Sequence, residues 1–470
     1  MNSVLESTAC HLVGIKGVGM TSLAQLLVDA GKTVTGTDVS AKFVTQPILD
    51  RLDISVTTGF ESDIPSETDC LIYTAAHGGS QNPQVIAAQK AGITVYSHAD
   101  ALGAFFNSQQ GVAVCGVGGK SSTSAMIVWI MTQLGLDPSF SVGVGEIIGL
   151  ERTGRYNFSS KWIIAEADEF VTDPTAPARG EAITPRFWSL KPQIVVSKEI
   201  IWDHPDVYPT ESDYISAYKM FFNQINLSGS LIYKQQPQLP GLPTSAQTQI
   251  CYGTTTEHGP LWFELDTTTV GEQSKAVLHT ATASYPISLH IPGLFNLENA
   301  VAAVLACQEM GIAIPDAIRA LESFQSTKRR VERVGVKNGV LYYDDYAHHP
   351  FEIKHVIASF KQWYPEKRLI IAFQPHTYSR TKELFAEFVS ALSEAKELVL
   401  LDIFASARES ADSSISTQML AEAIEKYGNT IVHFQPSIAD LAAFCRTNLS
   451  NTDVCLTLGA GDIYQVHDML

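Results

Sequence analysis

A glycine-rich segment ending in Gly-Lys-Ser carries the clearest chemistry in this 470-residue chain. It follows a short apolar run, Gly111–Cys115, and precedes apolar residues at helical spacing, so we predict that it joins a buried strand to a helix. Backbone N–H groups at such a helix start face phosphates, the charge of Lys120 neutralises them, and the Ser121 hydroxyl suits Mg²⁺. The predicted triphosphate-binding residues are Gly116, Val117, Gly118, Gly119, Lys120, Ser121 and Ser122.

This loop is shorter than the usual eight-residue phosphate-binding pattern. Gly116 stands three places before Gly119, which leaves Gly-x-Gly-Gly-Lys-Ser-Ser-Thr. An alternative is a glycine-rich turn with an incidental lysine, but the flanking strand and helix favour phosphate binding. We therefore expect ATP as a substrate of the chain.

Acidic residues and a histidine follow two further apolar runs. The run Ile163–Glu169 ends in three acids, and parallel strands end at one edge of a sheet, so these carboxylates suit Mg²⁺ near the phosphate loop. Val195 and Val196 lead into Trp202–Asp206. His204 in that segment is predicted to complete a metal shell or to contact phosphate, with a capping or core histidine as the alternative.

A second glycine-rich turn, Gly14–Gly19, lies in the first part of the chain. Asp38 ends the next predicted strand, where a dinucleotide-binding fold places its ribose-binding carboxylate. Lys16 replaces the second glycine of G-x-G-x-x-G, where the backbone must approach a pyrophosphate closely. We predict binding of a nucleotide diphosphate here rather than of a redox dinucleotide, and a simple strand-to-helix turn is the alternative.

Amides and cations in the rest of the chain suit other parts of a nucleotide or an acidic substrate. Asn296 and Asn299 stand one turn apart at a predicted helix start, where amides can read an adenine edge, although Asn296 alone can be an N-cap. The basic run Lys328–Arg333 adjoins a predicted domain junction, so an arginine can reach a γ-phosphate, or the run is a solvated face. His376 and Arg380 follow a strand and suit a carboxylate or phosphate.

The elements that position these residues form three α/β blocks, which we predict as domains at 1–108, 109–325 and 326–470. In the first block, strands at 10–15, 33–37, 70–73 and 94–96 alternate with helices at 20–30 and 83–91, as in a Rossmann-like parallel sheet. The second is a phosphate-loop α/β domain with short strands between about 230 and 292 and a helix over 296–310. The third is again Rossmann-like, with strands at 340–344, 369–373, 398–403, 430–434 and 454–458.

Composition narrows the class of protein. The formal net charge of −17 argues against a large nucleic-acid surface. The seven cysteines form no C-x-x-C pair and most lie in apolar runs, so they are predicted to be reduced core residues. We find no basic, apolar leader and no apolar run long enough to span a membrane, so we expect a cytoplasmic protein without membrane insertion.

Together these motifs resemble the Mur ligase family, the ATP-dependent amide-forming enzymes of peptidoglycan assembly, over nearly the whole chain. The segments that carry the resemblance are Gly14–Met20, Gly116–Met126, Ala165–Glu169, Asp203-His204, Phe295–Ala303, Lys328–Arg330, Asp344–Pro350, Phe373–Thr381 and Gly459–Asp462. The resemblance implies a UDP-substrate domain, an ATP domain and an amino-acid domain, with domain closure required for catalysis.

Within the family the motifs are most similar to ligases that join L-alanine to the carboxylate of UDP-N-acetylmuramate through an acyl phosphate. The resemblance implies that Lys120, Glu166, His204, His376 and Arg380 are catalytic, that Ser121, Glu166 and His204 hold Mg²⁺, and that Asn296, Asn299, Arg330 and Asp345 join the phosphate loop in binding ATP. It assigns the UDP substrate to Gly17, Val18, Gly19, Met20, Asp38 and His77. A monomer or homodimer is expected.

The chain departs from the family pattern at several positions. Gly118 stands where a histidine is usual, Phe295 replaces the histidine before the first adenine asparagine, and Thr377 replaces an arginine. Lys219 stands 15 residues after His204, similar to a carbamoylated lysine of other members, but a surface lysine on a helix is the commoner arrangement.

Three other functions remain open from the sequence. A recycling ligase of the same family attaches a preformed tripeptide to UDP-muramate, and the long segment 170–191 favours it while Phe373–Arg380 favours the alanine enzyme. A non-catalytic nucleotide-binding relative is disfavoured by Lys120, Glu166 and His204. A nicotinamide-dependent oxidoreductase is disfavoured by Lys16 and by the phosphate loop.

Overall fold

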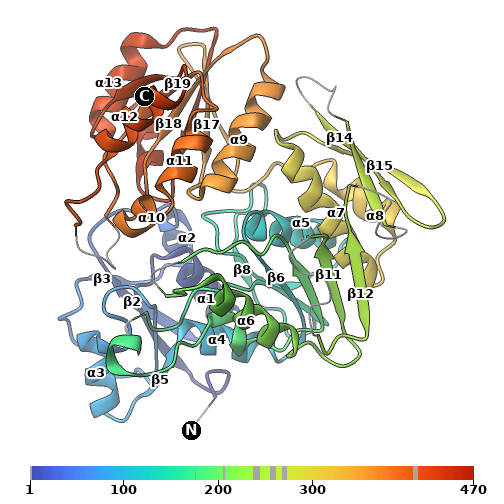
Figure 1. Cartoon of the computed structure of the whole chain (residues 1–470). Coiled ribbons are helices and arrows are strands. Elements are labelled where there is room, and N and C mark those ends of the chain that lie inside the picture. Colours follow the sequence, from blue (N-terminus) through green and yellow to red (C-terminus); the bar gives the residue numbers. More distant parts are fainter. Residues whose placement is uncertain are drawn as a thin grey trace. The chain divides into compact units, whose positions relative to one another are not determined.

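Three mostly parallel sheets, one in each predicted block, form the framework of the fold (Figure 1). The computed structural model describes residues 3–174, 176–204, 207–236, 244–254, 261–266, 273–405 and 411–470. Asp206 of the Trp202–Asp206 segment lies outside these residues. The predicted α/β class is confirmed, with one Rossmann-like sheet before the phosphate-loop sheet in the sequence and one after it.

The first sheet has the strand order β3-β2-β1-β4-β5, and all its neighbouring strands are parallel. Its central strand β1 is buried along its whole length, as expected for a parallel strand covered on both faces. Asn82 and Ser97 cap the two helices that follow β4 and β5. The elements are β1 Ala9–Val13, α1 Val18–Asp29, β2 Thr33–Asp38, α2 Gln46–Arg51, β3 Val56–Thr58, β4 Cys70–Tyr73, α3 Pro83–Lys90, β5 Thr94–Ser97 and α4 His98–Phe106.

The central sheet has the order β12-β11-β10-β6-β9-β7-β8, and only the edge strand β8 is antiparallel to its neighbour. Its middle strand β6 leads directly into the phosphate loop and α5. The elements are β6 Gln110–Cys115, α5 Lys120–Gln133, β7 Ser139–Ser141, β8 Gly154–Arg155, β9 Trp162–Glu166, β10 Ile194–Ser197, α6 Glu211–Phe222, β11 Ser230–Lys234, β12 Thr248–Tyr252, α7 Leu294–Glu309 and α8 Ile314–Leu321. A separate three-stranded sheet contains β13 Trp262–Asp266, β14 Ser274–His279 and β15 Ser284–Leu289.

Helix α1 packs the first sheet against the edge of the central sheet. The Ser22 hydroxyl lies 2.9 Å from the Ser141 hydroxyl and donates to Thr153 O at 2.8 Å. Gly154 lies so close that an added Cβ would meet Ser22 O at 2.1 Å. Side chains from both sheets share one apolar core. Residues 1–264, 277–287 and 298–324 therefore form one compact unit.

The third sheet belongs to a second compact unit, formed by residues 265–276, 288–297 and 325–470. Its order is β16-β17-β21-β18-β19-β20, with only the edge strand β16 antiparallel. Apolar cores cover both faces of this sheet. The elements are β16 Glu332–Lys337, β17 Val340–Asp345, α9 Pro350–Trp363, β18 Arg368–Phe373, α10 Tyr378–Glu383, α11 Phe385–Leu392, β19 Glu397–Leu400, α12 Thr417–Tyr427, β20 Ile431–Phe434, α13 Ile438–Asn448, β21 Asp453–Leu458 and α14 Val466–Met469.

Two predicted strands end earlier than the apolar runs suggest. The strand expected over 398–403 ends at Leu400, because Asp402 N donates to Pro436 O and the chain leaves the sheet. The run Ile163–Glu169 is a strand only to Glu166, so its last acids lie in a loop. All seven cysteines are free thiols and six are buried, which confirms the prediction of reduced core cysteines. Within the described residues, no helix is both long and apolar enough to cross a membrane.

His11 in β1 gives the first compact unit a pH-dependent stability. Its side chain is 2% exposed and burial lowers its pKa to about 4, so the folded chain resists a proton that the unfolded chain accepts near pH 6.5. The stabilisation is complete above pH 6.5 and is lost as the pH falls toward 4, by about 3 kcal/mol.

We expect hydrogen exchange of the β1 amides to report this loss as a lower free energy of opening at pH 4.5 than at pH 7. In His11→Asn, the difference between the two pH values is expected to shrink by about 2 kcal/mol, because the titrating group is gone. An unchanged pH difference in the variant would contradict the assignment to His11.

Candidate active site

The phosphate loop joins β6 to α5 through three glycines in left-handed conformations. The φ angles are +99° at Gly116, +75° at Gly118 and +87° at Gly119, a region that side chains with a Cβ adopt at a cost. Gly119 is the N-cap of α5 and Lys120 is its first residue. The unusual Gly118 therefore has a local physical reason, because the short loop reverses direction through consecutive left-handed residues.

Lys120 is bound by a carboxylate that the sequence did not single out. Its Nζ donates to both oxygens of Glu169, at 3.0 and 2.9 Å, and the Glu169 side chain is 2% exposed. Burial alone would lower the pKa of Lys120, but the charges of Glu169 and Asp168 outweigh it and raise that pKa well above its usual range. Lys120 is thus held charged at the loop where a phosphate would bind.

Ser121 and Glu166, both predicted as metal ligands, lie together. The Ser121 hydroxyl donates to Glu166 Oε2 at 3.0 Å, and Gly143 N donates to the other carboxylate oxygen at 2.6 Å. Glu166 ends β9, next to β6, so the parallel pairing of these strands brings the carboxylate to the loop. The strand arrangement accounts for this part of the predicted site.

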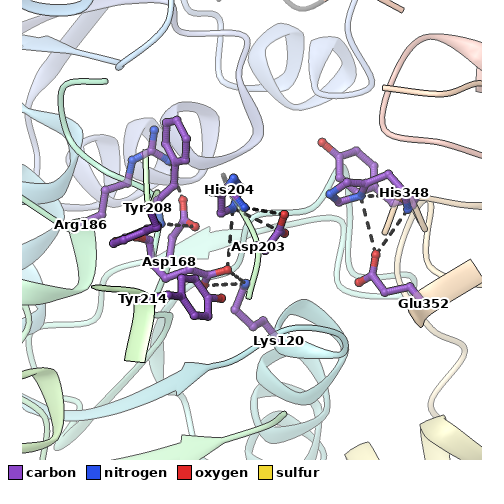
Figure 2. A network of polar contacts seen from close by, with 12 residues as sticks. Lys120, Asp168, Arg186, Asp203, His204, Tyr208, Tyr214, His348 and Glu352 are labelled. Carbon is purple, nitrogen blue, oxygen red and sulfur yellow. Dashed lines mark hydrogen bonds and ion pairs between the residues drawn. The ribbon is translucent and has the colours of Figure 1, made fainter. Parts of the chain in front are cut away.

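His204 lies beside two other carboxylates. Its Nε2 is 3.9 Å from Glu169 Oε1 and 3.7 Å from Asp203 Oδ2. One ligand atom from each of these three residues falls within 4.8 Å of the others, an arrangement that can hold a cation. Contacts of Lys120, Asp203 and His204 are drawn in Figure 2.

Asp168 forms an ion pair with an arginine from the long segment 170–191. Arg186 Nη1 lies 2.6 Å from Asp168 Oδ2, and its guanidinium lies over the ring of Phe170. Burial would raise the pKa of Asp168, but Arg186, Lys120 and His204 outweigh it and hold that pKa below its usual range. The sequence pattern contained these acids, yet three acids after one strand did not show which would face Lys120.

The donor chemistry of this edge fits Mg²⁺. Carboxylate and hydroxyl oxygens are the ligands that Mg²⁺ prefers, and Glu166, Ser121, Glu169 and Asp203 supply them beside the phosphate loop. His204 adds a nitrogen donor, which is less usual for Mg²⁺ than for transition metals. Lys219, by contrast, is exposed on α6, which agrees with a surface lysine.

The two predicted adenine asparagines lie in the first turns of α7. Each is 2% exposed, and Asn296 Nδ2 donates to Pro292 O at 2.8 Å. Asn299 lies against the phosphate loop, since a Cβ added to Gly119 would meet Asn299 Oδ1 at 2.2 Å. The fold therefore brings one of these amides directly beside the loop.

The turn predicted to hold the UDP substrate follows β1 and opens α1. Gly14 has φ +82°, Gly17 is the N-cap of α1, and Val18, Gly19 and Met20 form its first turn. The Asp38 carboxylate accepts hydrogen bonds from Lys16 N and Val39 N, each at 2.7 Å. It also lies 3.7 Å from His77 Nε2. In this structure Asp38 fixes the turn, and its role in substrate binding stays a prediction.

In the second compact unit, Arg330 and Asp345 occupy neighbouring polar positions. The Asp345 carboxylate accepts Val331 N and Ala347 N, each at 2.7 Å, and burial raises its pKa to about 6. The Arg330 guanidinium lies over the Tyr346 ring and 4.0 Å from Glu352. Glu352 also lies 3.7 Å from His348 (Figure 2).

His376 and Arg380 follow β18 as predicted, and Thr377 between them has a structural role. The His376 ring stacks on Phe404, and Arg380 is 6% exposed. Thr377 has φ +71° and caps α10 by accepting Arg380 N at 3.4 Å. The residue that departs from the family pattern thus fixes the backbone at Arg380.

The fold and the site together define an α/β protein with three mostly parallel sheets and a phosphate loop in the central one. Residues 9–110 match the Mur ligase family catalytic domain, residues 114–307 the Mur ligase middle domain, and residues 329–461 the Mur ligase glutamate ligase domain. A UDP-N-acetylmuramate–L-alanine ligase from Desulfitobacterium hafniense is 33% identical over 98% of this chain and 98% of that protein. The chain belongs to the Mur ligase family.

Solved structures agree on the fold. A UDP-N-acetylmuramate–alanine ligase from Thermotoga maritima has a TM-score of 0.77 at 22% identity, covering 99% of this chain and 98% of that one. A murein peptide ligase from Psychrobacter arcticus has a TM-score of 0.67 at 20% identity, covering 98% of each chain.

The left-handed loop conformation predicts a specific sensitivity of Gly118. In Gly118→Ala the added Cβ costs about 1 kcal/mol at φ +75° and shifts the loop, so we expect kcat/KM for ATP to fall at least about ten-fold. Gly135 has nearly the same φ, +73°, with open space around it. Gly135→Ala is the control, since it carries the same backbone strain at the far end of α5 and should keep kcat/KM for ATP. Equal losses in the two variants would contradict a specific role for Gly118.

Proposed function

We propose that this chain is an ATP-dependent ligase that joins L-alanine to the carboxylate of UDP-N-acetylmuramate in peptidoglycan precursor synthesis, releasing ADP and phosphate. The observation that carries the proposal is the phosphate loop whose Lys120 is held charged beside Glu166, Glu169 and His204. Similarity over the whole chain to L-alanine-adding ligases supports the substrate pair.

The reaction has two steps. An oxygen of the muramate carboxylate attacks the γ-phosphorus of ATP, the bond to the bridging oxygen breaks, and ADP leaves an acyl phosphate behind. The amine of L-alanine then attacks the acyl carbon, and the tetrahedral intermediate expels phosphate while the nitrogen loses a proton to phosphate or water. One carboxylate oxygen therefore leaves with the phosphate.

The chain's own residues serve these steps through charge and position. Lys120 neutralises the transferred phosphoryl group, and the loop N–H groups orient the phosphates. Ser121, Glu166 and His204 would hold Mg²⁺, with Glu169 and Asp203 beside His204, and the metal would supply charge stabilisation at the phosphoryl oxygens. His376 and Arg380 would bind the carboxylate of the amino acid.

The nucleotide and the UDP substrate have their own proposed sites. ATP would contact the phosphate loop, Asn296, Asn299, Arg330 and Asp345, and the UDP substrate would contact Gly17–Met20, Asp38 and His77. These assignments rest on the family resemblance and on the positions of the residues at loop and helix starts. A cytoplasmic location follows from the substrates, which are nucleotide-linked precursors.

A second candidate acceptor is a preformed tripeptide. The length of segment 170–191 favours it, and Arg186 from that segment forms an ion pair with Asp168 at the acidic edge. A non-catalytic relative would bind ATP without turnover.

The acceptor experiment separates these functions. With UDP-N-acetylmuramate, Mg²⁺ and ATP, we expect phosphate release to rise at least about ten-fold on adding L-alanine and to rise much less with glycine, L-serine or a tripeptide. Mass spectrometry should detect the UDP-N-acetylmuramoyl-alanine product. Faster turnover with the tripeptide would support the recycling ligase, and phosphate release that ignores every acceptor would contradict a ligase.

A further inference from the structure

Four charged side chains form a cluster beside the phosphate loop that the proposed chemistry does not use. They are Lys198 and Glu199 after β10, Lys234 at the end of β11, and Glu298 in the first turns of α7. Lys198 is 2% exposed, and the side chains of Glu199, Lys234 and Glu298 are between 14% and 20% exposed. Charged side chains that are largely buried require partners of opposite charge, so the contacts among these four residues show what holds them in place.

Lys234 is the centre of this cluster. Its Nζ donates to Glu199 Oε1 and to Glu298 Oε2, the latter at 2.5 Å. Burial would lower the pKa of Lys234, but the two carboxylates outweigh it and raise that pKa. Burial would raise the pKa of Glu199, but the positive charges of Lys198 and Lys234 outweigh burial and lower that pKa. One ammonium group thus ties together two carboxylates from separate segments.

Glu199, which carries the first carboxylate, contacts the phosphate loop through its backbone. Val117 N donates to Glu199 O at 2.6 Å, and Lys198 N donates to Cys115 O at 2.9 Å. A Cβ on Gly116 would meet Glu199 O at 2.8 Å, so the loop backbone lies directly on this segment. A shift of Glu199 would therefore displace the loop.

The second carboxylate belongs to the helix that carries the predicted adenine amide. Glu298 immediately precedes Asn299, whose amide oxygen lies against Gly119 at the other end of the same loop. The ion pair between Lys234 and Glu298 is therefore made on the same turn of α7 that carries Asn299.

We propose that Lys234 is a positioning residue for the nucleotide: by binding Glu199 and Glu298 together it fixes the phosphate loop and the first turns of α7 at the spacing that an adenine nucleotide requires. This inference rests on the proposed nucleotide site. Lys234 acts through Glu199 and Glu298 and is not itself assigned a contact with the nucleotide.

The test is the affinity of the full chain for ADP, measured by calorimetry with Mg²⁺. Lys234→Met removes the positive charge that binds the carboxylates of Glu199 and Glu298. We therefore expect the affinity for ADP to fall at least about ten-fold, while the affinity for UDP-N-acetylmuramate stays within about two-fold of the wild type. Lys234→Arg retains the charge and two donors, and should bind ADP within about three-fold of the wild type. Rescue by arginine and the split between two ligands are not expected of a merely structural role.

Lys32 provides a matched control. It is also a buried lysine, 8% exposed, and its Nζ donates to Leu5 O and Ser7 O, far along the chain from the loop. Lys32→Met should lower stability in a thermal unfolding scan yet keep ADP affinity. If Lys234→Met does not fold, Glu298→Gln and Glu199→Gln take its place, each expected to weaken ADP binding about three-fold or more.

The possible outcomes distinguish a failure of the positioning role of Lys234 from a failure of the proposed function. If the wild type binds ADP and the Lys234→Met variant binds it with the same affinity, the positioning role of Lys234 is wrong, but the proposed function is not contradicted. Equal losses in the Lys234 and Lys32 variants, or equal losses for both ligands, would overturn it too. A wild-type chain that binds no adenine nucleotide would overturn the proposed function and this inference together.

Discussion

The positive charge of Lys120 is the interaction on which the rest of the central site depends. Four carboxylates, those of Glu166, Asp168, Glu169 and Asp203, crowd the carboxyl edge of the central sheet. Lys120 binds the most buried of them, Glu169, through both oxygens. Removing one partner of a buried ion pair typically costs about 3–5 kcal/mol, because the other is left unpaired in a poorly solvated place. The loop lysine and the acidic edge must therefore be considered as one unit.

The Lys120–Glu169 ion pair can also be exchanged for contacts with ligands. A phosphate group brought to the loop offers Lys120 a second anion, and a divalent cation offers Glu169 a second partner, so the bound state exchanges one set of ion pairs for another. Tyr208 helps to keep Glu169 in place, since its hydroxyl donates to the Glu169 carbonyl at 2.5 Å. The Lys120–Glu169 pair balances the charges of the site, and the exchange of partners keeps them balanced.

The sequence predicted those parts of the site that follow from local patterns. Strand, glycine turn and helix are neighbours in sequence, so the phosphate loop around Lys120 could be predicted from its spacing. Glu166 was also predictable, because it ends a strand that pairs in parallel with β6. The role of Glu169 was not, since it lies in the loop after β9 and its direction depends on Tyr208 and Lys120.

Contacts between segments that are distant in the chain could not be predicted from the sequence. Lys234, Glu199 and Glu298 come from three separate elements, and only the strand order of the central sheet and the docking of α7 bring them together. Thr377 and Gly118 depart from the family pattern, and both have positive φ angles, Thr377 at the start of α10 and Gly118 in the phosphate loop. Asp38 stands at a ribose-binding position by its spacing, and its two oxygens accept hydrogen bonds from Lys16 N in the glycine-rich turn and from its neighbour Val39 N.

The most direct test of the account is the fate of the carboxylate oxygens. UDP-N-acetylmuramate labelled with ¹⁸O in both carboxylate oxygens is incubated with the chain, ATP, Mg²⁺ and L-alanine, and the released phosphate is analysed by mass spectrometry. Activation of the carboxylate by the γ-phosphate predicts one ¹⁸O atom in each phosphate and none in ADP. Unlabelled phosphate formed alongside the amide product would contradict it.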